Sequence, residues 1–572
     1  MKHLSFLSRS GIVAGLVALF AGTGAHAQTW QTAVAPIGGD AEITALTTGA
    51  NGDLYLTGTF EGTITVGATS LTSLGSLDVF VAKWRPATNS FVWAQRAGGT
   101  FVDHAVAVAV NGSSVYITGS LNSPTANFGA IVVNPVPGSS FGDYSSYVAK
   151  LTDAGATGAF VWATGFGGIA DDDAKALAVS GSNVYVGGTF EGTASFGGTT
   201  LTSAGDVDSF VAKLTDAGAS SAFAWAQRLG GTAEDGLRDL AVSGGNVYAT
   251  GYFESLSASF GPTTLANATQ TSPGTPPDVF VTKLVDAGAS SAFAWAQRGG
   301  GTGFDEPAGL AVNGTNVYIV GDFGFGNGNA TFGTTTLVAT GLTTVFVAKL
   351  SDAGPSGAFV WAQKAGGNRV DAAADIAVSG PNVYITGDFG NLTSNFGATA
   401  LTSAGQSDVY VAKLIDAGTT GSFAWAQRAG GTLSEEAHAL TVSGPTVYVA
   451  GYAGSTPAGF GSVSLPGNSN FLASITDNSA LASRAPSGLA TASVHPNPAH
   501  GTATVQWPAA AGTAPATLHL TDALGREVRR YSAALLPSSS TCALDLAGLP
   551  AGVYQLHVQA GANTRVFRLS VE

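Results

Sequence analysis

The chain has 572 residues, of which 79 are glycine and only 10% are charged, and its formal net charge at neutral pH is −14. This composition excludes a charge-rich disordered chain, and the lack of a three-residue glycine period excludes collagen. The single cysteine excludes a disulfide framework or a cysteine zinc site, and the negative charge makes nucleic acid an unfavourable partner.

Residues 1–27 have the features of a secretory signal peptide. Lys2 and Arg9 precede an apolar run from Gly11 to Phe20, and Ala25-His26-Ala27 forms a small-x-small cleavage site. The apolar run is too short to span a bilayer stably, and no later stretch reaches the roughly 18 apolar residues that a spanning helix needs. We expect an exported protein whose mature chain begins at Gln28 and contains no transmembrane helix.

Residues 28–475 repeat one unit seven times. Each copy contains four short runs rich in Val, Phe, Tyr and Trp, separated by turn sequences; in one copy they are ALAV, NVYVGG, SFVAKL and FAWAQ. Four strands joined by tight turns predict an antiparallel sheet, and seven such sheets in succession predict the blades of a β-propeller. The spacing of the copies is marked by Trp30, Trp93, Trp162, Trp225, Trp295, Trp361 and Trp425.

The two ends of the repeat predict how the ring closes. The last copy stops near Ile475 and lacks a fourth strand, whereas Gln28–Ala35 forms an orphan fourth strand without a sheet of its own. Placing the orphan strand in the gap completes the seventh sheet and leaves no unpaired edge. The predicted fold class is therefore all-β: a seven-bladed β-propeller closed by an N-terminal strand and followed by a small β-sandwich.

The copies also resemble a known repeat family. A GG-x3-D sequence, followed by a strand such as NVYATG, then DVFVTKL and then FAWAQ, is similar to the SBBP β-propeller repeat of bacterial secreted proteins. The resemblance covers roughly Gln28–Ile475. It implies an extracellular propeller, but the family has mostly unassigned functions and so supports a fold more than a role.

The tail has a different composition from the repeat. Residues 476–491 lack a strand pattern and indicate a linker, and residues 492–572 contain short alternating strands typical of a β-sandwich. Three tail motifs, HPNPA, DALGR and LAGLPAGVY, resemble the type A sorting domain of the type IX secretion system of Bacteroidota. The matching residues are Pro496, Asn497, Pro498, Asp522, Gly525, Arg526, Gly548, Leu549, Pro550, Gly552 and Tyr554.

That resemblance implies two partners, the type IX secretion machinery and a sortase that removes the tail within the linker. It also implies a Gram-negative bacterium in which the protein is secreted or attached to the outer cell surface. Whether the body stays anchored or is released is left open.

An acidic residue follows the GG of most copies by four positions. Two interpretations are open: a ring of carboxylates around the channel mouth that binds cations such as calcium, or carboxylates that each accept N–H groups in their own loop. We favour the second, because one residue repeated in every copy usually has a structural role, and we expect no other cofactor. Glu42 is the nearest acidic candidate in the first copy, and the other members are Asp103, Asp172, Asp235, Asp305, Asp371 and Glu435.

Two further repeated residues are assigned structural roles. A lysine in the third strand predicts an ion pair or a side chain whose stem lies along apolar surface, and Ser474 breaks this series. An aspartate in each DAG turn is interpreted as turn chemistry alone. The lysines are Lys83, Lys150, Lys213, Lys283, Lys349 and Lys413, and the aspartates are Asp153, Asp216, Asp286, Asp352 and Asp416.

No catalytic residues are predicted. The repeat contains only two histidines, His104 and His438, and neither belongs to a motif such as HExxH. We therefore predict a non-catalytic binding or adhesion module for an extracellular glycan or protein, with variable loops at Ser120–Phe141 and Leu265–Pro277 as contact surfaces. The alternatives are an enzyme that acts on extracellular polysaccharide, since 37 acidic residues are present, or a purely structural envelope protein.

Overall fold

The computed structural model describes residues 28–134, 143–269, 276–325, 328–390, 392–477, 493–507, 516–522, 526–533, 540–560 and 563–572. The chain divides into two compact units, Met1–Asp477 and Asn478–Glu572, and each is considered by itself. The predicted signal peptide and almost all of the predicted linker lie outside the described residues. Within the described residues every element is a strand except a 3-10 turn at Pro86–Thr88, so the all-β prediction is confirmed.

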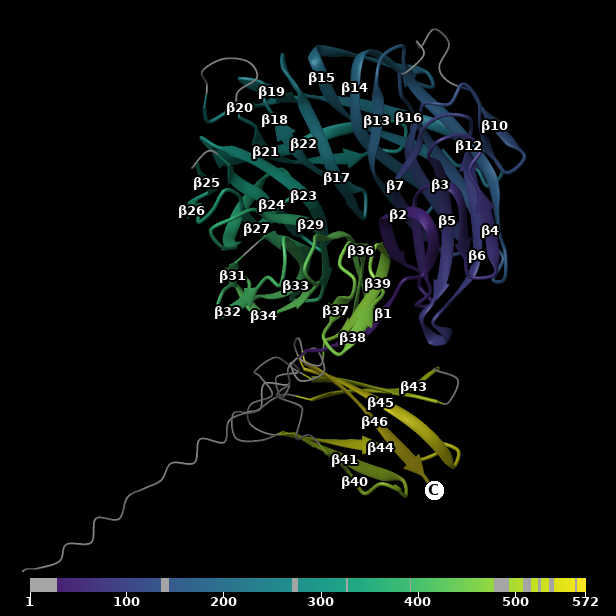
Figure 1. The fold of residues 1–572 in the computed structure, drawn as a ribbon. Coiled ribbons are helices and arrows are strands. Elements are labelled where there is room, and N and C mark those ends of the chain that lie inside the picture. Colours follow the sequence, from purple (N-terminus) through teal and green to yellow (C-terminus); the bar gives the residue numbers. More distant parts are fainter. Residues whose placement is uncertain are drawn as a thin grey trace, which may run out of the picture. The chain divides into compact units, whose positions relative to one another are not determined.

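The first unit contains seven four-stranded antiparallel arrays, which Figure 1 shows arranged around a common centre. The first strands are β2 (Ile37–Thr48), β7 (Asp103–Asn111), β13 (Asp172–Ser180), β17 (Asp235–Ser243), β23 (Phe304–Asn313), β29 (Asp371–Ser379) and β35 (Glu435–Ser443). The second strands are β3 (Leu54–Val66), β8 (Ser114–Leu121), β14 (Asn183–Phe196), β18 (Asn246–Phe253), β24 (Asn316–Phe325), β30 (Asn382–Gly390) and β36 (Thr446–Ala453).

The third strands are β5 (Asp78–Arg85), β11 (Ser145–Asp153), β15 (Thr199–Asp216), β21 (Asp278–Asp286), β27 (Thr344–Asp352), β33 (Ser407–Asp416) and β39 (Ser469–Thr476). The fourth strands are β6 (Ser90–Gly98), β12 (Gly158–Gly168), β16 (Ser221–Leu229), β22 (Ser291–Gly301), β28 (Gly357–Ala365), β34 (Gly421–Ala429) and β1 (Trp30–Val34). We number the sheets 1 to 7 by their first strands, so sheet 1 begins with β2 and sheet 7 with β35.

Short strands between the second and third strands form small hairpins that pair with the fourth strand of the preceding sheet in several places. They are β4 (Thr69–Thr72), β9 (Ala126–Phe128), β10 (Ile131–Val133), β19 (Ser257–Phe260), β20 (Thr263–Ala266), β25 (Asn329–Phe332), β26 (Thr335–Val338), β31 (Thr393–Phe396), β32 (Thr399–Thr402), β37 (Ala458–Phe460) and β38 (Val463–Leu465).

The N-terminal strand lies in sheet 7. β1 pairs antiparallel with β39, with Trp30 opposite Ile475 and Val34 opposite Leu472. The first strands also contact one another in the order β2, β7, β13, β17, β23, β29, β35, and β35 contacts β2. The first and last sheets are therefore neighbours, and we call the interface between sheet 7 and sheet 1 the seam.

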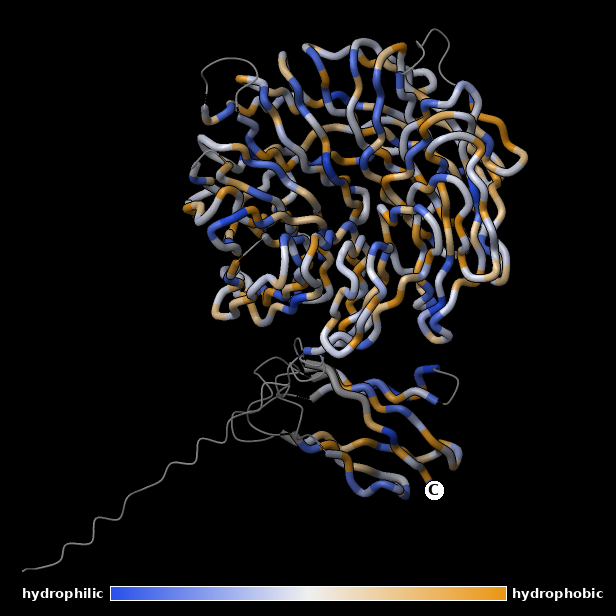
Figure 2. Tube along the Cα trace, in the orientation of Figure 1, coloured by the Kyte–Doolittle hydropathy of each residue, from blue (hydrophilic) through white to orange (hydrophobic). Residues whose placement is uncertain are grey.

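The hydrophobic core lies between adjacent sheets. Figure 2 shows apolar and polar segments alternating along the strands, as expected where side chains point to opposite faces. The third strands are the exception, because sheets pack on both of their faces and β21, for example, is buried from Asp278 to Leu284. The first strands are rich in alanine, since neighbouring first strands pack closely together.

The second unit is built from two sheets around one core. The first sheet contains β40 (Ser493–His495), β41 (Thr502–Trp507) and β44 (Ser540–Asp545), and the second contains β42 (Ala516–Thr521), β43 (Glu527–Ala533), β45 (Gly552–Ala560) and β46 (Asn563–Val571). Buried side chains of both sheets, such as Val505 and Leu544 from one and Leu518 and Leu556 from the other, form a single cluster. The arrangement matches the predicted β-sandwich.

Candidate functional site

The repeated lysines form buried ion pairs between sheets. The Nζ atom of Lys283 in sheet 4 lies 2.7 Å from Oδ2 of Asp352 in sheet 5, and both side chains are only 4% exposed. Tyr248 Oη and Trp295 Nε1 of sheet 4 also donate to this carboxylate, at 2.7 and 3.0 Å. Burial alone would raise the pKa of Asp352, but the Lys283, Tyr248 and Trp295 donors outweigh burial and lower the pKa.

The lysine, tyrosine and aspartate contacts recur at six interfaces, and the tryptophan donates at five of them, since Nε1 of Trp425 has no hydrogen-bond partner among the described residues; we call this group the interface clasp. The lysine–aspartate pairs are Lys83–Asp153, Lys150–Asp216, Lys213–Asp286, Lys283–Asp352, Lys349–Asp416 and Lys413–Asp477. The ion-pair prediction for the lysines is confirmed. The interpretation of the DAG aspartates as turn chemistry alone is wrong: each holds its turn through a glycine N–H, as Asp352 does with Gly354, but each also binds the preceding sheet.

The seam has none of the charged clasp groups. In sheet 6 Lys413 lies opposite Trp425 and Leu414 opposite Phe423, whereas in sheet 7 Ser474 lies opposite Thr32 and Ile475 opposite Trp30. Thr32 thus holds the tryptophan place of the clasp and Ser474 the lysine place, and their hydroxyls are 2.7 Å apart. The place of the clasp aspartate, three residues after Lys83, is taken by Pro86.

This register corrects one element of the sequence analysis. Trp30 does not mark the same place in the repeat as the other six tryptophans, because it occupies the position of Phe423, two residues earlier. Its indole packs edge-on against Phe460 and donates to the carbonyl of Arg428. The spacing of tryptophans therefore located the repeat but misplaced the N-terminal strand by two residues.

The predicted acidic ring is buried in separate loops. Each member accepts the N–H of the glycine four residues before it, as Asp305 Oδ2 does from Gly301 at 2.6 Å. All six side chains are at most 1% exposed: Asp103, Asp172, Asp235, Asp305, Asp371 and Glu435. The described residues contain no group of three or more His, Cys, Asp or Glu side chains arranged to hold a metal. Each carboxylate thus accepts an N–H group in its own loop, as the favoured interpretation expects, and a cation-binding ring around the channel mouth stays a prediction.

The first sheet has no member of this set. Glu42 lies opposite Thr59 in the register that places Glu436 opposite Tyr452, so Ala41 takes the place of Glu435. Glu42 was proposed as the nearest candidate, but it is one residue too late and its side chain is 56% exposed.

Sequence reasoning missed a second set of buried carboxylates. Four third strands contain an aspartate, five residues before the clasp lysine, that pairs with an arginine of the fourth strand: Asp78–Arg96, Asp208–Arg228, Asp278–Arg298 and Asp408–Arg428. The positive φ of Gly300, +127°, brings its Cα so close that an added Cβ would lie 2.4 Å from Asp278 Oδ1 and 3.0 Å from Asp305 Oδ2. Burial, and to a lesser degree Asp278, raises the pKa of Asp305 to about 8.

The repeat itself held the signal for these pairs. Where the aspartate is replaced, by Ser145 in sheet 2 or Thr344 in sheet 5, the arginine is replaced as well, by Gly165 or Lys364. The seam again differs from the other interfaces. It has Ser469 and Ala41 at the two carboxylate positions, so no carboxylate is buried there.

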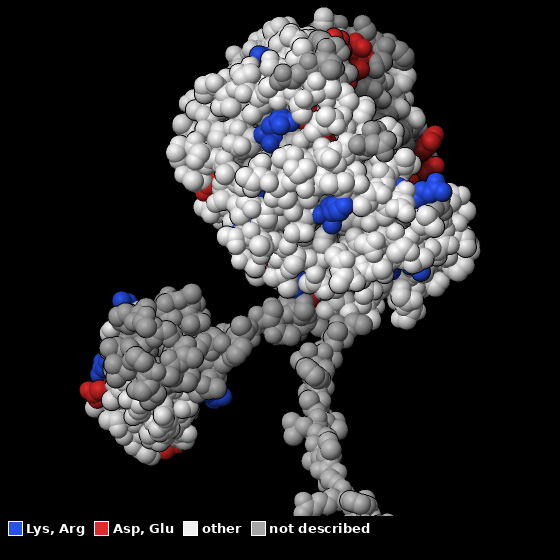
Figure 3. Space-filling model, turned by 90° about the vertical axis from the view of Figure 1, so that its left-hand side faces the viewer, with Lys and Arg blue, Asp and Glu red and all other residues white. Residues whose placement is uncertain are grey.

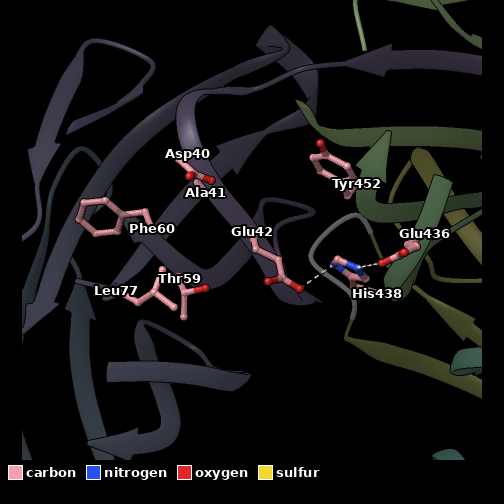
Figure 4. A pocket seen from close by; sticks show the side chains of 9 residues that line it. All are labelled: Asp40, Ala41, Glu42, Thr59, Phe60, Leu77, Glu436, His438 and Tyr452. Carbon is pink, nitrogen blue, oxygen red and sulfur yellow. Dashed lines mark ion pairs between the residues drawn. The ribbon is translucent and has the colours of Figure 1, made fainter. Parts of the chain in front are cut away.

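Cavities border the seam where the repeated side chains are replaced. One of about 200 Å³ is lined by residues that include Thr32, Pro86, Tyr448 and Ser474. A second, of about 350 Å³, lies among first- and second-strand residues of sheets 7 and 1 (Figure 4). We call it the seam pocket, and it is lined by Asp40, Ala41, Glu42, Thr59, Phe60, Leu77, Glu436, His438 and Tyr452.

A histidine in the wall of the seam pocket lies between two carboxylates. His438 Nδ1 lies 3.0 Å from the carbonyl oxygen of Ile43 and 3.6 Å from Glu42 Oε1, and Nε2 lies 3.8 Å from Glu436 Oε2 (Figure 4). A carbonyl oxygen can only accept, so Nδ1 carries a hydrogen and donates to Ile43, while Nε2 faces Glu436. The pocket thus presents several acceptors close together and faces solvent through Glu42 and Glu436, both more than half exposed.

A third cavity adjoins this pocket. It has a volume of about 420 Å³, shares Asp40, Ala41 and Tyr452 with the seam pocket, and is otherwise lined by Gly39, Asn468, Ser469 and Asn470. Tyr452 Oη donates to Asn468 Oδ1 at 2.7 Å, which fixes the ring between the two cavities. By contrast, the two predicted contact loops lie only partly within the described residues, which omit 135–142 and 270–275.

The motif residues of the tail hold turns of the β-sandwich. Asn497 donates from Nδ2 to the carbonyl of Arg568 and accepts from the N–H of Ser570, which ties the first motif to β46. Asp522 accepts from the N–H and the guanidinium of Arg526, and Tyr554 Oη donates to the carbonyl of Pro550. Gly525 lies outside the described residues.

Comparisons with known proteins agree with the tail motifs. Residues 493–572 match the family described as "Secretion system C-terminal sorting domain". The regulatory protein FlaEY of Caulobacter vibrioides is 27% identical over 226 residues, a match that spans 37% of this chain and 23% of that protein.

Two solved structures have a distant likeness to this chain. Trypanosoma rangeli sialidase in complex with the inhibitor DANA is 11% identical, with a TM-score of 0.33 and coverage of 82% of this chain and 86% of that chain. A glycoside hydrolase family 32 protein from Bifidobacterium adolescentis is 8% identical, with a TM-score of 0.23 and coverage of 76% and 77%. Neither likeness bears on activity.

No helix in the described part of the chain is long and apolar enough to cross a membrane. The C-terminal match instead explains how the protein leaves the cell. The tail is a type IX secretion sorting domain, and the protein is secreted or attached to the outer cell surface of a member of the Bacteroidota.

Proposed function

We propose that residues 28–477 form a closed seven-bladed β-propeller of the SBBP type that acts outside the cell as a non-catalytic binding module. The pairing of β1 with β39 and the circular order of contacts among the first strands support the ring. The type IX machinery exports the protein, and a sortase removes the tail. The ligand of the propeller, a glycan or a protein, contacts the seam pocket.

The observation that carries the binding role is the position of the cavities. Six interfaces between sheets are filled by the clasp, whereas the seam replaces its lysine, tryptophan and aspartate with Ser474, Thr32 and Pro86. Binding sites in a repeat architecture are expected where the repeat is broken, since equivalent interfaces satisfy one another by packing. The seam pocket and its neighbours lie at this break.

The chemistry of the seam pocket favours binding over hydrolysis. Glycoside cleavage needs a carboxylic acid kept protonated by an apolar environment and a second carboxylate facing the same bond. Glu42 and Glu436 are both more than half exposed, and His438 lies between them. Figure 3 shows one face of the first unit, on which the Lys and Arg side chains stand apart from one another on a mostly uncharged surface.

A paired binding and turnover measurement tests this proposal. The fluorescently labelled mature chain is applied to arrays of extracellular glycans and peptides, and the retained ligands are then assayed for released reducing sugar and cleaved peptide. We expect retention without product, and retention should fall in the variant Glu42→Gln/Glu436→Gln. Glu191→Gln in sheet 3, an exposed position away from the seam, is the control for loss of charge. Product formation would refute the non-catalytic role, and unchanged retention by the double variant would exclude the seam pocket.

A further inference from the structure

An arrangement of side chains equivalent to that of the seam pocket, which we call the internal copy, lies between sheets 4 and 5. In the register of sheet 4, Gly236 is opposite Tyr252, and Arg238 follows at the bulge; in sheet 7, Glu436 is opposite Tyr452, and His438 follows at the bulge. On the next sheet, Glu306 holds the position that Glu42 holds in sheet 1. Arg238 therefore corresponds to His438, and Glu306 to Glu42.

In that internal copy the protein supplies its own cation. Arg238 Nη2 lies 2.9 Å from Glu306 Oε2, and the guanidinium carbon lies 4.8 Å from the centre of the Tyr252 ring. A guanidinium offers five N–H donors in a plane and therefore suits both a carboxylate and an aromatic face. The interface between sheets 4 and 5 is thus closed by a guanidinium.

At the seam the corresponding side chain is shorter and its surroundings are more acidic. His438 lies 3.6 Å from Glu42 and 3.8 Å from Glu436, and the space beside them is the seam pocket of about 350 Å³. With Nδ1 facing the carbonyl of Ile43, the other ring nitrogen of His438 faces Glu436. Two carboxylates therefore border this space, and a carboxylate can only accept hydrogen bonds, so a group with several donors suits it.

Glu436, the second carboxylate of the seam pocket, also changes the position of Tyr452 relative to that of Tyr252 in the internal copy. A Cβ added at Gly236 would lie 2.4 Å from the ring of Tyr252, so that ring can rest against sheet 4 only because position 236 is glycine. Glu436 has a Cβ at the equivalent position, and Tyr452 instead donates to Asn468. The ring then forms a wall between the seam pocket and its 420 Å³ neighbour.

The seam is also the one interface of the seven at which both neighbouring sheets have a carboxylate at the position of Glu42. The residues at the position of Glu42 are Glu42, His104, Asp173, Gly236, Glu306, Ala372 and Glu436 in sheets 1 to 7. All seven positions lie within the described residues, and only Glu436 and Glu42 are acidic neighbours across an interface. A guanidinium at the seam would therefore meet two carboxylates, whereas Arg238 meets one.

From these observations we infer that the seam pocket binds the guanidinium group of an arginine side chain presented by an extracellular peptide. The inference rests on the proposed binding function and names its ligand chemistry. Glu42 and Glu436 accept from the guanidinium. The adjoining cavity, with Asn468 and Asn470 in its walls, receives the peptide backbone beside the arginine.

Titration calorimetry on the full mature chain tests the inference with four probes. They are N-acetyl-arginine amide, N-acetyl-citrulline amide, N-acetyl-lysine amide and the peptide acetyl-Gly-Gly-Arg-Gly-Gly-amide. Citrulline has the shape of arginine without its charge, so we expect at least tenfold weaker binding, and lysine should fall between the two. The peptide should bind more tightly than arginine amide, and equal affinities would restrict the site to free guanidinium compounds and refute the peptide part of the inference.

Variants at the two copies separate the site from its surroundings. Glu42→Gln and Glu436→Gln should each weaken arginine binding about three- to tenfold, because each removes one charge-assisted contact. His438→Arg should abolish binding, because the new side chain fills the pocket as Arg238 does in sheet 4, a position that shows an arginine is tolerated at this bulge. Arg238→His opens the internal copy, which has one carboxylate, and should leave the stoichiometry at one.

The outcomes distinguish this inference from the proposed function. Equal affinity for arginine and citrulline, or unchanged binding by His438→Arg, refutes guanidinium recognition at the seam pocket. If no arginine probe binds, but array ligands are retained and lost in Glu42→Gln/Glu436→Gln, the inference fails and the binding function stands. If neither probes nor arrays show binding, both fail.

Discussion

Six interfaces between sheets and the seam solve the same packing problem with different side chains. At the six, buried lysine, tryptophan and aspartate side chains interlock neighbouring sheets, and at least one further carboxylate is buried near each. At the seam, Ser474, Thr32, Pro86 and Ala41 take these positions. The seam nevertheless keeps the backbone pairing that joins neighbouring sheets elsewhere. Ala97, at the end of a fourth strand, pairs with Phe128 in the hairpin of the next sheet, and at the seam Ile37 and Gly38, which continue the chain after β1, pair in the same way with Val66 and Thr65.

This difference indicates that the interfaces that hold the sheets rigidly together are not the interface that has room for a ligand. Buried ion pairs satisfied by several donors fix the relative position of two sheets, because any movement leaves a charge unpaired. Such an interface has no room for a ligand. The seam joins the two ends of the repeat by strand pairing and small hydroxyl groups, and it is the interface where cavities open.

The largest expected effect comes from breaking one clasp. Asp352→Ala leaves the ammonium of Lys283, 3% exposed, without its carboxylate, and also removes the acceptor of Tyr248 and Trp295. We expect a loss of about 3–5 kcal/mol in the free energy of unfolding, measured by urea denaturation. Pro86→Ala, the equivalent position at the seam, should cost less than about 1 kcal/mol. A similar cost at both positions would remove the distinction between the interfaces.

Buried carboxylates whose pKa values are raised give the interfaces that contain them a pH dependence. Burial raises the pKa of Asp305 to about 8, above the ordinary value of 3.8. A carboxyl whose folded-state pKa is raised stabilises the fold fully below the unfolded-state pKa near 3.8, and this contribution is lost as pH rises toward 8. Asp305→Asn removes the titration, and we expect it to gain about 3–4 kcal/mol relative to the parent between pH 5 and pH 8.

The opposite sign is expected at a clasp. The pKa of Asp352 is lowered, because its donors outweigh burial, so its contribution is present above the unfolded-state value and is lost as pH falls through the lowered folded-state pKa. Unfolding curves of Asp305→Asn and Asp352→Asn measured from pH 3 to pH 8 check both signs. Parallel pH profiles for the two variants would contradict the assignment.

A clasp can also be transferred to the seam. Ser474→Lys alone should destabilise the protein, because it places an ammonium beside Tyr448 and Thr32 without a carboxylate. Adding Pro86→Asp supplies the partner, and a double-mutant cycle should return a favourable coupling of about 1–2 kcal/mol. The double variant should leave arginine binding unchanged, since neither residue lines the seam pocket. A coupling near zero would show that the seam cannot hold a clasp.

The sequence predicted the sheets well because each is built from nearby residues. Strand order, turn positions and the pairing of the orphan strand with the last copy all follow from local pattern and from counting strands. The clasp was missed because its parts lie about 100 residues apart, Tyr248 and Asp352 for example, and each part alone has an adequate local explanation.

The candidate site was missed for a related reason. Glu42 and Glu436 lie at opposite ends of the repeat and meet only because the first and last sheets are neighbours. The loop before β2 is two residues shorter than its counterparts, since Ala41 follows Gly39 by two residues where Glu435 follows Gly431 by four, and this moved the expected acidic position of sheet 1 from Ala41 to Glu42. Aligning the copies on the glycine opposite each bulge, such as Gly58 and Gly451, would have corrected that shift.

The smallest expected effect concerns the internal copy of the seam pocket. Arg238 and Glu306 are each 39% exposed, so their ion pair is largely screened by solvent, and Glu306→Gln should change the free energy of unfolding by only about 0.2–1 kcal/mol. The same substitution at the seam, Glu42→Gln, should be equally mild for stability, because Glu42 is 56% exposed. Their effects on arginine binding should nevertheless differ, with a loss for Glu42→Gln and none for Glu306→Gln. Two exposed carboxylates at equivalent positions of the repeat would then have different roles: Glu306 binds the guanidinium of Arg238, and Glu42 binds that of a ligand. Calorimetry on the two variants measures that difference directly.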